Sequence, residues 1–182
     1  AGHTLAVGGV PDPNALETSV TYDGLGRMTS VTPPAADGCS SARPTTRIQY
    51  ELTSSPASQP VSRVISTTQL ACTGSLESNT LRSIGYVDGL GRVRATLAPA
   101  GAEEGAWVRG GLTRLDRKGA VREAWQSDFF DGAETSFSSV LATPSESFPH
   151  TRSVYDAFGR VRVAYAEDGS LTSTSFHALS TD

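Results

Sequence analysis

The chain has 182 residues and a mass of 19.0 kDa, with 15 basic and 19 acidic side chains and a formal net charge of -4. This length fits one domain or a piece of a larger protein, and the acidic balance excludes a nucleic-acid backbone as partner. A hydrophobic fraction of 37% excludes disorder over the whole chain, and no apolar run reaches the roughly 20 residues of a membrane-spanning helix.

The sequence of residues 1–80 predicts a lead-in and two hairpins. Residues 1–17 are rich in glycine and proline and indicate a loop or a short edge strand. Residues 18–34 form a first clear β-hairpin, because apolar and polar residues alternate on both sides of a glycine turn. Residues 35–80 hold an inserted hairpin, whose expected strands are residues 45–52 and 61–70.

Residues 81–182 continue the same pattern. Residues 81–99 predict a second clear hairpin, and residues 100–132 a weaker one followed by a turn at Asp131-Gly132. Residues 133–150 are a serine-rich connection, and residues 151–182 predict a third clear hairpin, a turn at Asp168-Gly169 and a last strand. No stretch has the composition of a domain linker, so we expect residues 1–182 to form a single segment of repeats with an inserted hairpin at about 35–80.

A short string recurs at each clear hairpin and consists of a tyrosine, an aspartate, a glycine and an arginine. The three copies are Tyr22, Asp23, Gly26 and Arg27; Tyr86, Asp88, Gly91 and Arg92; and Tyr155, Asp156, Gly159 and Arg160. A decayed copy keeps Asp116 and Gly119, and a fifth copy is interpreted as split by the insertion between Tyr50-Glu51 and Ser62-Arg63-Val64. Such self-similarity predicts one structural unit per repeat.

Each position of the string has a mechanical interpretation. The aspartate carboxylate can accept hydrogen bonds from the N–H groups of the turn, and the glycine supplies a positive φ. We expect the tyrosine ring to end one strand on its buried face, and the arginine to begin the next strand, where it reaches the aspartate, a carbonyl or a neighbouring repeat. The predicted unit is therefore a strand, an Asp-capped turn and a second strand.

The string resembles the YD repeat of the Rhs, teneurin and Tc-toxin B/C proteins, written roughly as Tyr-Asp-x-x-Gly-Arg, and the copies cover the chain from about residue 18 to its end. The resemblance implies an all-β fold of stacked antiparallel hairpins that form part of a coiled β-sheet shell. In bacterial toxin members such a shell encloses a C-terminal effector, and in teneurins it is part of an extracellular adhesion protein.

The function implied by the resemblance is structural and non-enzymatic: a wall segment that encapsulates a toxin or effector cargo in a secreted or cell-surface bacterial protein. The sequence begins at Ala1 without Met or signal peptide and ends at Asp182 in a Ser/Thr-rich stretch, so we expect a piece of a longer polypeptide. Its partners would be the rest of that polypeptide and the cargo. The isolated segment would expose sheet edges, so we expect poor solubility or self-association.

An extracellular adhesion or carbohydrate-binding module is the alternative function. Aromatic side chains could make a sugar-stacking face, although filling of the wall is the interpretation that we favour for them. These aromatic residues are Trp107, Trp125, Phe129 and Phe130. An enzyme would need one site of convergent polar groups, whereas the acid–arginine pair recurs at every repeat.

No residue pattern predicts a catalytic, cofactor or metal site. Cys39 and Cys72 flank the inserted hairpin and could form a disulfide or stay separate thiols, but neither has the spacing of a zinc site. The histidines are isolated, and the carboxylate neighbours along a strand point to opposite faces. These histidines and carboxylate pairs are His3, His150 and His177, and Glu103-Glu104 and Glu167-Asp168.

Overall fold

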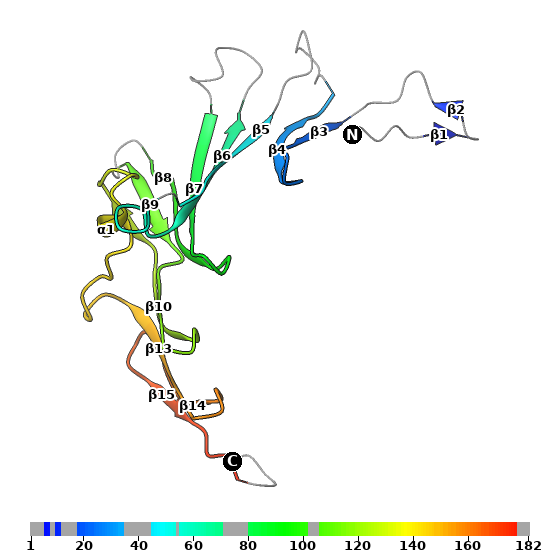
Figure 1. Cartoon of the computed structure of the whole chain (residues 1–182). Helices are drawn as coiled ribbons and strands as arrows, with labels where there is room; N and C mark the ends of the chain where they lie inside the picture. The colour runs from blue at the N-terminus through cyan, green and yellow to red at the C-terminus, as the bar shows by residue number, and fades with distance from the viewer. Residues whose placement is uncertain are drawn as a thin grey trace. The chain divides into compact units, whose positions relative to one another are not determined.

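The computed structural model describes residues 6–7, 10–11, 18–34, 45–53, 55–70, 80–101 and 106–177. Nearly all of the regular structure in these residues is β-strand, and every strand pair described is antiparallel. The sheets are open rather than closed into barrels (Figure 1). The prediction of an all-β fold of adjacent antiparallel hairpins is confirmed.

The chain divides into two compact units, residues 1–53 with 62–84 and residues 54–61 with 85–182. In the first unit the strands lie in the order β3-β4-β5-β6-β7, and β1 and β2 form a separate pair. The strands of this unit are β1 (Ala6–Val7), β2 (Val10–Pro11), β3 (Ser19–Tyr22), β4 (Met28–Thr32), β5 (Thr46–Glu51), β6 (Ser62–Gln69) and the first five residues of β7 (Thr80–Val87).

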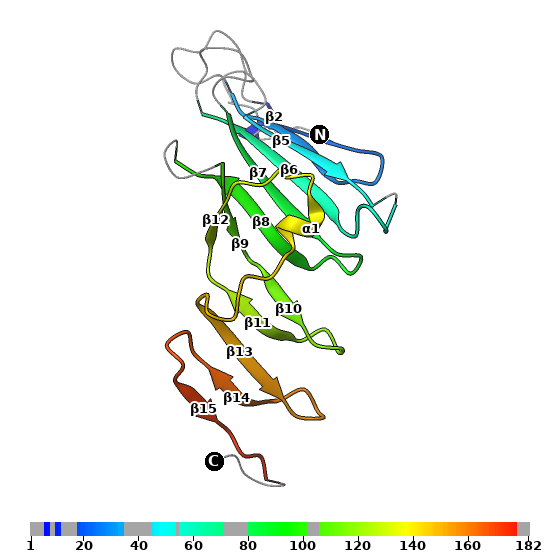
Figure 2. The ribbon, with the colours of Figure 1, turned by 90° about the vertical axis from the view of Figure 1, so that its left-hand side faces the viewer.

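The second unit contains the end of β7 and two groups of strands. One group has the order β7-β8-β9-β12, and the other is a five-stranded sheet with the order β10-β11-β13-β14-β15. The turns of the β7–β8, β10–β11 and β13–β14 hairpins lie at the same edge (Figure 2). The strands are β8 (Val93–Pro99), β9 (Trp107–Gly110), β10 (Thr113–Leu115), β11 (Val121–Trp125), β12 (Asp128–Phe130), β13 (His150–Tyr155), β14 (Val161–Tyr165) and β15 (Leu171–Ser173).

The inserted hairpin forms where the sequence predicts its strands. β5 and β6 pair over six residues, from Thr46 opposite Thr68 to Glu51 opposite Arg63. Cys39 and Cys72 lie outside the described residues, so their pairing stays a prediction. His3 and Glu103-Glu104 also lie outside the described residues. The prediction that residues 1–182 form one continuous repeat segment likewise stays a prediction.

One short helix differs from the expectation of a plain serine-rich connection at residues 133–150. It is α1 (Phe137–Val140), a single turn in which Val140 is buried. The fully buried Tyr86 contacts the Phe137 ring edge to face at 6.0 Å between ring centroids and donates a hydrogen bond of 2.6 Å to the Glu134 carbonyl. Tertiary contact, rather than helix propensity, therefore fixes this segment against the strands.

The apolar core follows the inward-facing positions of the strands. In the second unit it includes Tyr86, Ala95, Leu97 and Trp125 with the α1 residue Val140, all of which are buried. In the first unit Ile65 and Ile84 are buried. No helix of the described residues is long and apolar enough to cross a membrane.

Candidate functional site: the Asp-capped turns

Four turns share one hydrogen-bond pattern, and we call them the Asp-capped turns: residues 23–27, 88–92, 116–120 and 156–160. In each, the N–H of the first residue donates to the carbonyl of the fifth at 2.8–3.0 Å, and the glycine N–H donates to the aspartate carbonyl at 3.0–3.1 Å. The glycines Gly26, Gly91, Gly119 and Gly159 all have positive φ, between 75° and 84°. A side chain with a Cβ atom rarely adopts this backbone conformation, so the glycine is required.

The aspartate caps the turn with one carboxylate oxygen. In the 88–92 turn, Oδ1 of Asp88 accepts hydrogen bonds from the N–H groups of Leu90 at 2.9 Å and of Arg92 at 3.0 Å. The other three turns repeat both bonds within 0.1 Å of these lengths. The predicted Asp-capped hairpin turn is thus present at the decayed copy, residues 116–120, as well as at the three clear copies.

The arginine closes the turn through the second oxygen. Nε of Arg92 donates to Oδ2 of Asp88 at 2.8 Å, and Nη2 of Arg92 lies 2.8 Å from the same oxygen. Arg27 and Arg160 make the same two contacts with Asp23 and Asp156 at 2.7–2.8 Å. The 116–120 turn has Ala120 at this position, so it lacks the arginine contact and is held by its backbone bonds and by the two bonds to the Asp116 carboxylate.

These bonds stabilise the charged form of the aspartates. The backbone N–H of Arg27 and that of Arg92 are the largest causes that lower the pKa of Asp23 and of Asp88 below the ordinary value of 3.8, against the opposing effect of burial. For Asp156, burial raises the pKa, but the hydrogen bonds from Arg160 and Phe158 outweigh it and the pKa is lowered. These three turns are therefore built around ionised carboxylates.

Tyrosine hydroxyls connect a hairpin to the one before it. Tyr50 Oη donates to the Met28 carbonyl at 3.1 Å in the first unit, and Tyr155 Oη donates to the Val121 carbonyl at 2.7 Å in the second. Met28 and Val121 occupy equivalent places, the first residue after an Asp-capped turn. Tyr50 and Tyr155 thus satisfy a backbone acceptor of the preceding hairpin, whereas Tyr86 donates to the Glu134 carbonyl of a later segment.

Cations connect a hairpin to the one after it. Nη1 of Arg92 donates to the Gly119 carbonyl at 3.4 Å, and Nζ of Lys118 donates to the Ala157 carbonyl at 2.5 Å. Two further arginines lie over aromatic rings that follow them in the chain. The Arg27 guanidinium is 4.3 Å from the centroid of the Tyr50 ring in β5, and that of Arg160 is 4.1 Å from the centroid of the Phe176 ring, which follows β15. Cation–π contacts at this distance are attractive.

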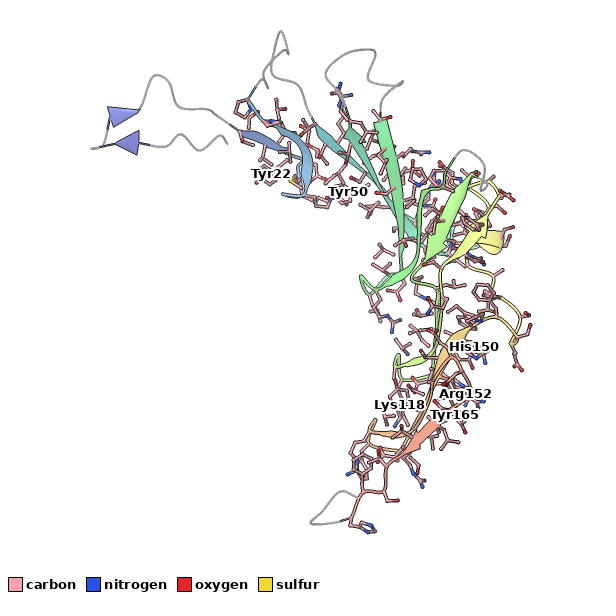
Figure 3. The ribbon with its side chains drawn as sticks, turned by 180° about the vertical axis from the view of Figure 1, so that it is seen from behind. Tyr22, Tyr50, Lys118, His150, Arg152 and Tyr165 are labelled. Atoms are coloured by element: carbon pink, nitrogen blue, oxygen red, sulfur yellow. The ribbon has the colours of Figure 1, made fainter. Side chains whose placement is uncertain are left out.

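The expectation that every repeat tyrosine lies on the buried face is wrong for Tyr22. Its side chain is 57% exposed, whereas that of Tyr86 is completely buried. β3 is the outermost described strand of its sheet, so no preceding hairpin among the described residues covers Tyr22. Figure 3 shows Tyr22 at this end of the first unit, with Tyr50 on the inner strand β5.

The split copy keeps its charged pair across two strands. Glu51 and Arg63 lie directly opposite each other in β5 and β6, and Arg63 Nε donates to Glu51 Oε2 at 2.9 Å. The acid and the arginine of the repeat therefore meet here through strand register instead of through a five-residue turn.

Sequence reasoning missed a buried arginine in β9. Arg109 lies opposite Asp128 of β12 and donates to its carboxylate through Nε at 2.9 Å and Nη2 at 2.5 Å. Its Nη1 is within 3.0–3.1 Å of three carbonyls at the end of α1, those of Ser139, Val140 and Ala142. The only available signal was a lone Arg and Asp in two short strands, with no turn motif to join them.

The aromatic residues considered for sugar stacking do not gather on one surface. Trp125 is buried and stacks on His150 with 5.6 Å between ring centroids, whereas Phe129 is exposed on β12. Trp107 and Phe130 are opposite each other in β9 and β12 and are half-buried. His177 is exposed, and Glu167 accepts a hydrogen bond from the Gln126 amide. Among the described residues, no group of three His, Cys, Asp or Glu side chains could hold a metal ion.

No family model matches the sequence, and no curated protein matches it. Solved structures do match. The "Crystal Structure of TcdB2-TccC3" has a TM-score of 0.66 and 18% identity over 91% of this chain and 10% of that one. The "Crystal Structure of TcdB2-TccC3 without hypervariable C-terminal region" has a TM-score of 0.64 and 14% identity over 91% of this chain and 12% of that one. The chain thus shares the fold of the matched part of these structures and spans about a tenth of the length of the chains it resembles.

Proposed function

We propose that this chain is a structural segment in the wall of a container that encloses a toxin or effector polypeptide. The observation that carries the proposal is the recurrence of one Asp-capped turn with contacts to neighbouring hairpins. Tyr155 donates to the hairpin before its turn, and Arg92 and Lys118 donate to the hairpin after theirs. Such nearest-neighbour contacts let stability accumulate along a row of hairpins. The fold shared with TcdB2-TccC3 chains supports the proposal that the row of hairpins forms part of a wall.

We also propose that the segment has no catalytic role. The carboxylate–arginine pairs have the composition of a charged active centre, but each aspartate already accepts two backbone N–H groups and an arginine within its own turn. A carboxylate whose two oxygens already accept these hydrogen bonds is suited to fixing the turn. The adhesion alternative draws less support, because one of its four candidate aromatic residues is buried and the others lie on different faces or are half-covered.

Limited proteolysis of the complete polypeptide encoded by the gene tests the container. If a cargo lies inside, a region outside the repeats is cleaved slowly in the native protein and rapidly after mild denaturation. Arg92→Gln combined with Arg160→Gln removes two turn closures and should speed this cleavage. Arg47→Gln, which removes one positive charge at an exposed residue outside the turns, should not. Equal cleavage rates for the native and the denatured cargo region would contradict the proposal.

A further inference from the structure

A hollow of about 600 Å³ lies between the β10–β11 and β13–β14 hairpins of the second unit. The ladder that joins β11 to β13 has three residue pairs and ends at Glu123 opposite Arg152, so it does not continue toward the two turns. Two hydrogen bonds cross the gap between the hairpins. The Tyr155 hydroxyl donates to the Val121 carbonyl at 2.7 Å, and the Lys118 ammonium group donates to the Ala157 carbonyl at 2.5 Å. We call this hollow the slot. Figure 3 labels Lys118 in the β10–β11 turn and Arg152 in β13.

A β-bulge directs one arginine of the slot. Arg114 is opposite Glu123 and Leu115 is opposite Val121, so Arg122 is the extra residue of the bulged strand. Neighbours on a regular strand point to opposite faces, yet Nε of Arg122 lies 3.7 Å from Oε1 of Glu123. The bulge has therefore turned the Arg122 side chain to the same face of the sheet as Glu123. Arg152, the cross-strand partner of Glu123, lies on that face too.

An equivalent bulge in the first unit also places two consecutive side chains on one face. Thr29 is the extra residue between Met28 and Ser30, and the neighbours Thr29 and Ser30 both contact Oγ1 of Thr21, at 2.9 and 2.7 Å. Two consecutive side chains share one face there too. The residue two places after the turn is Thr29 in the first hairpin, but it is an arginine in the others, Arg94, Arg122 and Arg162.

The slot has an excess of positive charge in a chain whose net charge is -4. Its four cations and two carboxylates are Arg117, Lys118, Arg122 and Arg152, and Asp116 and Asp156. Asp156 is already paired with Arg160, and Glu123 is paired with Arg114 at 2.8 Å, closer than with Arg122. Among the described residues, neither Arg117 nor Arg152 forms an ion pair.

The surroundings of the slot limit the kind of anion that fits. Arg152 also lines an adjoining hollow of about 370 Å³, whose lining includes the carboxylates of Glu123, Glu146 and Glu167. A long polyanion would meet these carboxylates and be repelled. A short peptide with acidic side chains followed by basic ones would meet positive charge in the slot and negative charge beside it.

We propose that the slot binds a short acidic segment of a polypeptide, with the Arg122 and Arg152 guanidinium groups donating to its carboxylates. Guanidinium–carboxylate pairs are charge-assisted and directional, so they select carboxylates over amides of the same shape. The proposal concerns one unit of this chain and stands whether or not the wall encloses a cargo.

Fluorescence anisotropy with the full chain and two labelled peptides tests the slot. The peptides are Glu-Glu-Gly-Gly-Lys-Lys and the same peptide with Gln in place of both Glu. At low ionic strength, the Glu peptide should bind at least roughly tenfold more tightly than the Gln peptide. Equal affinities for the two peptides, or no binding of either, would overturn the proposal without bearing on the container.

Matched variants locate the binding. The double variant R122Q/R152Q should lose roughly tenfold or more in affinity for the Glu peptide, while R47Q, with one charge removed from β5, should change it less than about twofold. The double variant R122K/R152K keeps the charge and should retain part of the binding. An equal loss in R47Q and in R122Q/R152Q, corrected for the number of charges, would show non-specific attraction and overturn the assignment. So would a short RNA that displaces the peptide at equal charge concentration.

Discussion

At the scale of single residues, the aspartate of the repeat does more than the other members of the string. One of its oxygens holds two backbone N–H groups, and the other holds the arginine. The 116–120 turn, which has lost the arginine, still has both backbone bonds to Asp116. The carboxylate and the glycine thus define the turn, and the arginine adds a closing contact.

The glycine before the arginine can be tested against a second glycine in the same turn. Gly91 has φ of 79°, whereas Gly89 is not in the positive-φ region, and a Cβ atom at either would meet nothing within 4 Å. Gly91→Ala should therefore lower the free energy of unfolding by about 1–2 kcal/mol through backbone strain, and Gly89→Ala should leave it nearly unchanged. Urea denaturation measures both, and equal effects would contradict the requirement for a left-handed residue.

The lowered pKa values predict a loss of stability in acid. The pKa of Asp23, Asp88 and Asp156 is lowered from 3.8 in the folded chain, so the unfolded chain binds more protons as the pH falls. Stability from these groups should be complete above about pH 5 and be lost as the pH falls below about 4 through the folded pKa values.

The matched protein for the acid experiment carries Asn at all three positions, because Asn still offers an oxygen to the turn N–H groups but does not titrate. Its urea midpoint should be lower than that of the parent chain at neutral pH and should depend less on pH between about 5 and 2.5. If both proteins lost stability equally in acid, the aspartates would not be the source of the effect.

Arg109 provides a test of a buried charge. Arg109→Met leaves the Asp128 carboxylate and three carbonyls of the α1 segment without their donor. The free energy of unfolding should fall by about 3–5 kcal/mol, and Arg109→Met combined with Asp128→Leu should recover part of this loss. Thermal unfolding measures both variants. Arg47→Met, at an exposed arginine, serves as control, and a loss as large as that of Arg109→Met would contradict the role of the burial.

At the scale of elements, the turns could be predicted from sequence because all of their bonds join residues at most four apart. The β5–β6 pairing followed from alternating strands on both sides of a polar loop. The Arg109–Asp128 pair could not be predicted, because it joins residues 19 apart whose strands are three or four residues long. The exposure of Tyr22 depends on the strand next to it, and α1 depends on Tyr86, so neither has a local signal.

β15 is the outermost described strand of the five-stranded sheet, and we expect its outward edge to cause association between molecules. Its neighbour β14 accepts a hydrogen bond from the Thr174 N–H, and alternation along the strand turns the Ser173 N–H away from β14. Ser173→Pro should remove an outward donor without breaking the β14–β15 ladder and so reduce association at this edge.

Analytical ultracentrifugation of the 182-residue chain tests this edge. The parent chain should form dimers and larger species with increasing concentration, and Ser173→Pro should form fewer of them, whereas Ser173→Ala should behave like the parent. A parent chain that stays monomeric at high concentration would contradict the expectation of open, adhesive edges.

At the scale of the whole molecule, we propose that the hairpins join laterally into one wall around a cargo. A cryo-electron microscopy map of the complete polypeptide tests this most directly. We expect the strands of this chain to lie in a continuous wall, with the 88–92, 116–120 and 156–160 turns in one row and a separate polypeptide segment enclosed by the wall. A map in which both faces of these sheets are open to solvent, with no enclosed chain, would contradict it.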